Sequence, residues 1–254
     1  MTGGHRHLVV IGGQRCGTTY LADLLEAHPD VALASPRRPE PKVFLSDEVL
    51  ARGHEWYVET WFADRGSARV LAEKSTSYID HPDAAARIDR VLDEPLVLAQ
   101  VREPVARAVS HWRFSAHHGV EHRSLHDALA ESLVQERAWD PETYSVSPFA
   151  YVSRGDYAAA LRPWVERFGE RLRVQFMDEV VSGEAVDDLF AWMGLPAPQH
   201  KEREPANESP GEEPEIGAEL LQRLHEHFAP RDQALRELLG RSLPWDDTRH
   251  EGAR

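Results

Sequence analysis

The stretch Gly12–Thr19 constrains the fold of this chain more than any other part of the sequence. An apolar run, His7–Gly12, leads into it, and an amphipathic stretch, Thr18–Ala27, follows it directly. The apolar run predicts a buried strand, and the spacing of Leu21 and Leu25 predicts a helix. The chain therefore passes from a strand to a helix through a short loop that contains glycines, which is typical of α/β folds with a parallel sheet.

The rest of the chain repeats this alternation of short apolar runs and helical stretches. Further strands are predicted at residues 31–34, 69–73, 96–102 and 172–177. Further helices are predicted at residues 47–61, 81–92, 104–114, 124–136, 155–168, 184–193, 215–228 and 232–239. We expect a single domain over residues 1–254, with residues 115–150 as an insertion beside the sheet and residues 196–214 as a lid loop.

The loop Gly12–Thr19 has the composition of an anion-binding site. Gly12 and Gly17 have the spacing of a P-loop, so the fold expected is a P-loop-like, three-layer α/β fold with a central parallel sheet flanked by helices. Glycines let the backbone approach an anion, and N–H groups at a helix N-terminus point toward it. The lysine that follows the second glycine of a P-loop is replaced by Thr18, and the loop's cation is Arg15. Unless this is an ordinary strand-to-helix turn, the predicted anion-binding residues are Gly13, Gln14, Arg15, Cys16, Gly17, Thr18 and Thr19.

A second candidate anion contact follows the apolar strand predicted at residues 96–102. Arg102 ends this strand, Pro104 begins the next helix, and Ser110 lies two turns along that helix. In an open α/β sheet, an arginine at the carboxyl end of a strand faces the ligand crevice. A guanidinium and a hydroxyl together suit a phosphate group. Taken alone, a solvent-exposed arginine and a solvated serine are the simpler interpretation.

Together these segments resemble the sulfotransferases that use 3′-phosphoadenosine-5′-phosphosulfate (PAPS), in particular their heparan-sulfate and bacterial branch. Residues 12–19 are similar to the family's 5′-phosphosulfate-binding loop, and residues 101–112 to its 3′-phosphate-binding motif. Residues 73–78 (Glu-Lys-Ser-Thr-Ser-Tyr), residues 38–44 (Arg-Pro-Glu-Pro-Lys-Val-Phe) and the run Gly155-Asp156-Tyr157 also match that branch. The resemblance covers most of residues 8–245. The chain departs from the branch at Arg15, where lysine is usual, and at Pro39, which replaces a lysine.

The resemblance implies that PAPS is bound through both of its phosphate-bearing ends. The loop would hold the 5′-phosphosulfate, with Arg15 beside the oxygen that leaves. Arg102 and Ser110 would hold the 3′-phosphate, and Lys201 and Arg203 are further candidate contacts with the cofactor.

The resemblance also implies an in-line displacement at sulfur, in which an acceptor hydroxyl attacks and adenosine 3′,5′-bisphosphate leaves. Glu40 is the expected general base, and Arg15 is expected to stabilise the oxygen that leaves. Lys42 and Lys74 are expected to polarise the sulfonyl group or to orient the acceptor. A solvated loop carboxylate is the alternative for Glu40. His111, His117 and His118 are the alternative bases. No metal is expected, because this chemistry requires none and the 14 histidines show no metal-ligand spacing.

The charge of the chain limits the partners that we expect. Residues 1–120 contain 14 basic and 16 acidic side chains, whereas residues 121–254 contain 15 and 27. Such acidity disfavours nucleic acid and other long polyanions, so a small acceptor with a free hydroxyl is expected. One cysteine and no long apolar run predict a cytoplasmic protein without an integral membrane segment, and a homo-oligomer is compatible with the sequence. Composition hints at a bacterial source.

Two other functions remain open at this stage. A P-loop kinase or nucleotidase is supported by the apolar strand at residues 172–177, which ends in Asp178 and Glu179 like a Walker B strand. The absence of the P-loop lysine argues against it. A nucleotide-binding module without catalysis is the third hypothesis, and Glu40 speaks weakly against it.

Overall fold

A parallel sheet forms the centre of the structure, a computed structural model that describes residues 5–140, 143–144, 146–198 and 215–246. The sheet has five strands in the order β2-β3-β1-β4-β5, and every neighbouring pair is parallel. The strands are β1 (Arg6–Gly12), β2 (Val31–Leu33), β3 (Val70–Lys74), β4 (Leu96–Val101) and β5 (Leu172–Phe176). The predicted α/β fold with a central parallel sheet is therefore confirmed.

The central strand is β1, and the two strands beside it are β3 and β4. Val10 pairs with Lys74 on one side and with Leu98 on the other. Because the strands are parallel, their carboxyl ends lie along the same edge of the sheet. Gly12 ends β1, Glu73 lies one residue before the end of β3, and Arg102 directly follows β4 in the chain. The three motifs therefore follow three neighbouring strands, β3, β1 and β4.

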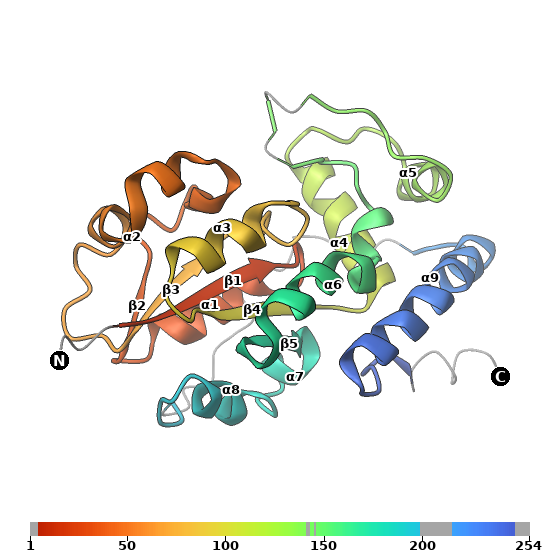
Figure 1. Cartoon of the computed structure of the whole chain (residues 1–254). Helices are drawn as coiled ribbons and strands as arrows, with labels where there is room; N and C mark the ends of the chain where they lie inside the picture. Colours follow the sequence, from red (N-terminus) through yellow and green to blue (C-terminus); the bar gives the residue numbers. More distant parts are fainter. Residues whose placement is uncertain (1–4, 141–142, 145, 199–214, 247–254) are drawn as a thin grey trace. The chain divides into compact units, whose positions relative to one another are not determined.

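Helices cover both faces of this sheet (Figure 1). They are α1 (Thr18–Glu26), α2 (Glu48–Trp61), α3 (Ala84–Val91), α7 (Met177–Val181) and α8 (Val186–Trp192), with short 3₁₀ turns η1 (Val43–Leu45) and η3 (Gly169–Arg171). On one face, β1 buries Leu8 and Val10 against α1 and α8. On the opposite face, α2 reaches β3 through a hydrogen bond from Tyr57 to Glu73. Burial on both sides explains why the strands read as continuous apolar runs.

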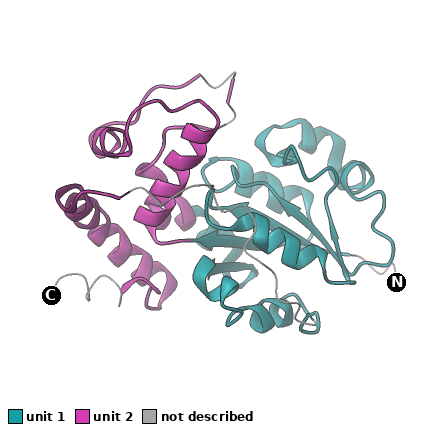
Figure 2. Ribbon diagram, turned by 180° about the vertical axis from the view of Figure 1, so that it is seen from behind, with its two compact units in different colours: residues 1–101, 163–207 teal, residues 102–162, 208–254 magenta. Residues whose placement is uncertain are grey.

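The described chain forms two compact units, each built from two separate stretches (Figure 2). Residues 1–101 and 163–207 make the first unit, which contains the sheet, and residues 102–162 and 208–254 make the second. Helical elements of the second unit are α4 (Pro104–His117), α5 (Leu125–Ser132), η2 (Ser153–Gly155) and α9 (Ala218–Leu239), while α6 (Tyr157–Phe168) runs from one unit into the other. The predicted insertion at residues 115–150 falls in the second unit. A single domain over residues 1–254 stays a prediction. Among the helices described, none is long and apolar enough to cross a membrane.

The C-terminal helix differs from the sequence-based expectation. We predicted two helices, at residues 215–228 and 232–239, separated around Pro230. The structure has one helix, α9, that continues through Pro230. Its buried side chains recur every three or four residues on both sides of the proline: Leu220, Leu224, Phe228, Asp232 and Leu235. Packing of this continuous stripe outweighs the hydrogen bond that a proline removes from a helix.

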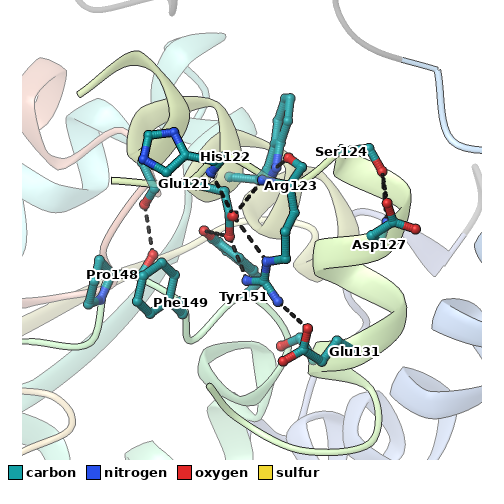
Figure 3. A network of polar contacts seen from close by, with 12 residues as sticks. Glu121, His122, Arg123, Ser124, Asp127, Glu131, Pro148, Phe149 and Tyr151 are labelled. Atoms are coloured by element: carbon teal, nitrogen blue, oxygen red, sulfur yellow. Dashed lines mark hydrogen bonds and ion pairs between the residues drawn. The ribbon is translucent and has the colours of Figure 1, made fainter. Parts of the chain in front are cut away.

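A network of hydrogen bonds and ion pairs around Glu121 stabilises the second unit (Figure 3). The buried carboxylate of Glu121 accepts hydrogen bonds from the hydroxyl of Tyr151 (2.9 Å) and from Nε (3.0 Å) and Nη2 (2.6 Å) of Arg123. The backbone N–H groups of His122 and Arg123 also donate to it, both at 2.9 Å. Arg123 also forms an ion pair with Glu131 of α5. Burial raises the pKa of the Glu121 carboxyl, but the hydrogen bonds from Arg123 and Tyr151 outweigh burial and hold the pKa at about 2.

We expect this network to make the protein sensitive to acid. The pKa of Glu121 is lower in the folded chain than the usual 4.5, so the folded form binds its proton less readily than the unfolded form. The stabilisation is therefore complete above pH ~4.5 and is lost as the pH falls toward ~2, at a cost of about 3 kcal/mol. Glu121→Gln should lower the free energy of urea unfolding at pH 7 and flatten its decline in acid. Glu237→Gln, on an exposed side chain of α9, is the control; equal pH curves for both variants would contradict the prediction.

Candidate functional site

The glycine loop joins β1 to α1 at the carboxyl edge of the sheet. Gly17 is the N-cap of α1 in a left-handed conformation (φ 73°), and no side chain caps the helix. The first turn of α1 contains no acidic residue. The first N–H groups of a helix have no intrahelical acceptor, so this N-terminus can receive an anion.

Two of the loop's glycines are required by close packing. A Cβ on Gly12 (φ +140°) would lie 2.9 Å from Cγ2 of Ile79 and 3.0 Å from the carbonyl oxygen of Thr76. A Cβ on Gly17 would lie 2.9 Å from Cγ of Met177. Because only glycine fits at Gly12, the end of β1 can lie directly against the segment that carries Thr76.

Gln100 of β4, which is 0% exposed, binds the loop through two hydrogen bonds. Its backbone oxygen accepts from the N–H of Gly13 (2.6 Å), and its side-chain Nε2 donates to the carbonyl of Cys16 (2.6 Å). Gln100 therefore fixes both ends of the Gly13–Cys16 turn. The sequence analysis did not single out Gln100, although an amide within an apolar strand is a signal for such a contact.

The other residues of the loop occupy different environments. Arg15 has a left-handed backbone (φ 67°) and a half-buried side chain. Cys16 is fully buried, with Sγ 3.7 Å from the carbonyl oxygen of Gln14, which agrees with a role in filling space. Thr18 is buried and Thr19 is half-buried, both in the first turn of α1.

Glu40 and Lys74, predicted from separate segments, are brought together by the fold. Nζ of Lys74 lies 2.5 Å from Oε1 of Glu40, and the two side chains are 15% and 18% exposed. Thr76 donates to the same carboxylate from its backbone N–H (2.9 Å to Oε2) and from its hydroxyl (3.0 Å to Oε2). The alternative of a loop carboxylate surrounded by solvent is therefore wrong for Glu40. Thr76 was not predicted as a site residue, because its contact spans 36 residues of sequence.

Lys42 lies at the start of η1 in a left-handed conformation (φ 53°). Its backbone N–H donates to Oγ of Ser75 at 2.9 Å. The segments 40–42 and 74–76 are thus joined by both side-chain and backbone contacts.

The predicted 3′-phosphate residues belong to the second unit. Arg102 is half-buried, and its backbone carbonyl accepts from the hydroxyl of Tyr157 at 2.9 Å. Glu103 caps α4 by accepting from the backbone N–H of Ala106. Ser110 is half-buried and lies on α4, eight residues after Arg102, which precedes that helix. Tyr157, from the segment that resembles the family, therefore contacts the backbone of the residue expected to bind phosphate.

The three histidines considered as alternative bases differ in their exposure to solvent. His111 is 2% exposed and packs edge-on against Tyr151, while His117 and His118 are exposed at the end of α4. Lys201 and Arg203 lie outside the described residues, as does most of the expected lid. Within the described ranges, no group of three His, Cys, Asp or Glu side chains could hold a metal ion.

Comparisons with curated proteins find sulfotransferases. The chain is 26% identical over 198 residues to the bifunctional heparan sulfate N-deacetylase/N-sulfotransferase 1 of Caenorhabditis briggsae, which covers 74% of this chain and 22% of that protein. The chain thus spans about a fifth of the length of that relative. It is 25% identical over 262 residues to the mouse heparan sulfate glucosamine 3-O-sulfotransferase 5, covering 93% of this chain and 73% of the relative. No protein-family model matches the chain.

The fold agrees with these matches. A sulfotransferase crystal structure from Alicyclobacillus acidocaldarius superimposes with a TM-score of 0.74 at 23% identity, over 94% of this chain and 98% of that one. This likeness shows the fold, and the curated relatives carry the assignment. The curated relatives, together with this agreement in fold, support a sulfotransferase family assignment for the chain.

Proposed function

We propose that this chain transfers a sulfonyl group from PAPS to a small acceptor that carries a hydroxyl group. One observation carries the proposal above the others. The Glu40–Lys74 pair lies close to the glycine loop, since Thr76 donates to the Glu40 carboxylate and its carbonyl oxygen leaves no room for a Cβ on Gly12. Sulfonyl transfer needs a base, a cation and a site for an anionic donor, and here a carboxylate, a lysine and an anion-binding loop can supply them.

The loop would bind the 5′-phosphosulfate of the donor. The uncapped N-terminus of α1 supplies N–H groups, and residues Gly13–Thr19 surround it. Arg15 supplies the positive charge that a P-loop places on its lysine, and here it would stabilise the charge on the departing oxygen. Arg102 and Ser110 would bind the 3′-phosphate, a role that rests on their sequence motif. Lys201 and Arg203 stay candidate contacts on the same basis.

Glu40 would accept the proton of the acceptor hydroxyl. A carboxylate has about four lone-pair positions for hydrogen bonds. Within the described structure, three donors occupy them: Nζ of Lys74, the N–H of Thr76 and the hydroxyl of Thr76. The Glu40 side chain is 18% exposed, so part of the carboxylate stays accessible to an acceptor hydroxyl, and this supports a role as general base.

The transfer itself would be one displacement. The acceptor oxygen forms a bond to sulfur as its proton passes to Glu40. The bond from sulfur to the bridging oxygen breaks, and its electron pair leaves with adenosine 3′,5′-bisphosphate. Lys74, which is paired with Glu40, would supply the cation that a sulfonyl oxygen or the acceptor needs, and Lys42 is a second candidate for that role.

The kinase alternative loses its main support in the structure. Asp178 and Glu179 lie in the first turn of α7, after the edge strand β5. β4 separates that strand from β1, which leads into the glycine loop. An acidic strand end directly beside β1 would have favoured magnesium-dependent phosphoryl transfer.

The acceptor would be a metabolite, a sugar or a lipid rather than a long polyanion. The acidity of residues 121–254 supports this, since it would repel an extended anionic chain. Because the relatives are named for O-sulfation and N-sulfation of a glycan, hydroxyl and amine acceptors are the two classes to compare in an activity assay. A cytoplasmic location and a homo-oligomer stay predictions.

An acceptor screen with PAPS tests the proposal. We expect a mass gain of one sulfonyl group on at least one hydroxyl acceptor, and tighter binding of adenosine 3′,5′-bisphosphate than of adenosine 5′-phosphate. Matched amine acceptors should gain less. Binding of ATP with magnesium in place of adenosine 3′,5′-bisphosphate would instead support the kinase, and binding without any product would support a module without catalysis.

A further inference from the structure

Glu73 is a fully buried carboxylate that the proposed mechanism does not use. It lies beside Lys74 in β3 and is 0% exposed. Because side chains alternate along a strand, Glu73 points to the opposite face from Lys74. There it meets Tyr57 of α2 rather than the acceptor side of the site.

Three hydroxyl groups donate to this carboxylate. Ser75 Oγ (2.8 Å) and the hydroxyl of Tyr78 donate to Oε1, and the hydroxyl of Tyr57 (2.8 Å) donates to Oε2. Burial is the largest effect and raises the pKa of Glu73 above its usual value, although the hydrogen bonds from Tyr78, Ser75 and Tyr57 act in the opposite direction. Apolar residues of equal volume often replace buried ionic groups without loss of stability. Stability alone therefore does not explain this carboxylate, and the other hydrogen bonds of the hydroxyls indicate a further role.

Two of these hydroxyls also accept hydrogen bonds from the segment that follows Glu40. A hydroxyl has one proton, so a hydroxyl that donates to Glu73 turns its lone pairs elsewhere. Ser75 Oγ accepts from the backbone N–H of Lys42 at 2.9 Å. The hydroxyl of Tyr78 accepts from the backbone N–H of Phe44 at 3.2 Å.

We propose that Glu73 is a positioning residue that fixes the base-bearing segment, residues 40–44, through Ser75 and Tyr78. Lys42 needs such an anchor, because its left-handed backbone is one that lysine seldom adopts. Residues 74–76 then hold the segment at two points. Lys74 and Thr76 bind the Glu40 carboxylate, and Ser75 binds the backbone two residues further on. The inference rests on the proposed function, in which Glu40 is the base.

Tyr57 provides a matched control within the same cluster. Tyr57→Phe, Ser75→Ala and Tyr78→Phe each remove one hydrogen bond to Glu73. Only the last two also remove the acceptor of a backbone N–H in residues 40–44. The ring of Tyr57 packs on Phe44 with centroids 5.3 Å apart, and phenylalanine keeps that contact.

The test measures turnover, donor KM, melting temperature and amide hydrogen exchange in all three variants. Ser75→Ala and Tyr78→Phe should lower kcat about ten- to a hundredfold with little change in donor KM, since small displacements of a catalytic group cost up to ~10²-fold. Exchange at the amides of Lys42 and Phe44, respectively, should become faster. Tyr57→Phe should lower the melting temperature while kcat and both exchange rates stay near wild type.

A conservative replacement of Glu73 adds a rescue arm. Glu73→Gln keeps an oxygen that can accept from Ser75 and Tyr78, so it should retain most of the turnover that Glu73→Leu loses. Equal loss of kcat in Tyr57→Phe and the other two hydroxyl variants would overturn the proposal, because a purely structural cluster predicts that result. Unchanged exchange at Lys42 and Phe44 would overturn it as well. That readout is independent of activity, so it stands even if Glu40→Gln remains active and the base is assigned elsewhere.

Discussion

Replacing Glu40 by glutamine should reduce turnover by about 10²–10⁴-fold, the usual effect of losing a general base. Glutamine keeps the length of the side chain but cannot accept a proton. It also exchanges one acceptor oxygen for a donor, which then faces either Lys74 or the N–H of Thr76. Binding of adenosine 3′,5′-bisphosphate should remain nearly unchanged, because Glu40 is expected on the acceptor side of the sulfur.

The measurement is kcat at saturating acceptor, together with product affinity by calorimetry. Lys74→Met is the comparison, since it frees the carboxylate of its ion pair and leaves the proton acceptor in place. Near-normal turnover in Glu40→Gln would show that Glu40 is not the base. His117 and His118 would be tested next because they are exposed, ahead of His111, which is buried.

The sequence predicted the parts of the site that depend on local pattern. An apolar run followed by glycines and a helix gave the β1–α1 loop at the correct residues. The motif segments around Glu40, Lys74 and Arg102 each lie next to a strand or turn, where local signals are strong. Glu40 and Lys74 could be named individually, but nothing in either segment indicated that they form an ion pair.

What could not be predicted depends on contacts between distant segments. Thr76 meets Glu40 across 36 residues, and Gln100 meets Cys16 across 84 residues. Sequence spacing has no information on such pairs. Glu73 did leave a signal, since a glutamate within an apolar strand must find buried partners. Those partners, Tyr57 and Tyr78, come from a helix and a turn whose placement only the fold defines.

Arg15 is the residue whose removal should damage both binding and chemistry. It is the only basic residue in Gly12–Thr19, and Thr18 occupies the place of the usual lysine. The same cation would hold the phosphosulfate in the ground state and stabilise the oxygen that leaves. Loss of a charge-assisted hydrogen bond costs about 1.5–3 kcal/mol, so Arg15→Ala should weaken adenosine 3′,5′-bisphosphate roughly ten- to a hundredfold. The single-turnover rate should fall further, by about 10²–10³-fold, because the charge on the departing oxygen grows in the transition state.

Lysine and glycine at the same position separate charge from backbone effects. Arg15 has a φ of 67°, a left-handed conformation that alanine and lysine disfavour alike and glycine adopts freely. Arg15→Lys should recover much of the affinity and rate lost in Arg15→Ala, because it restores the charge at the same backbone cost. Arg15→Gly should stay as defective as alanine although its backbone is relaxed. Recovery by glycine and failure of lysine would mean that the loop's conformation, and not the cation, is what the reaction needs from residue 15.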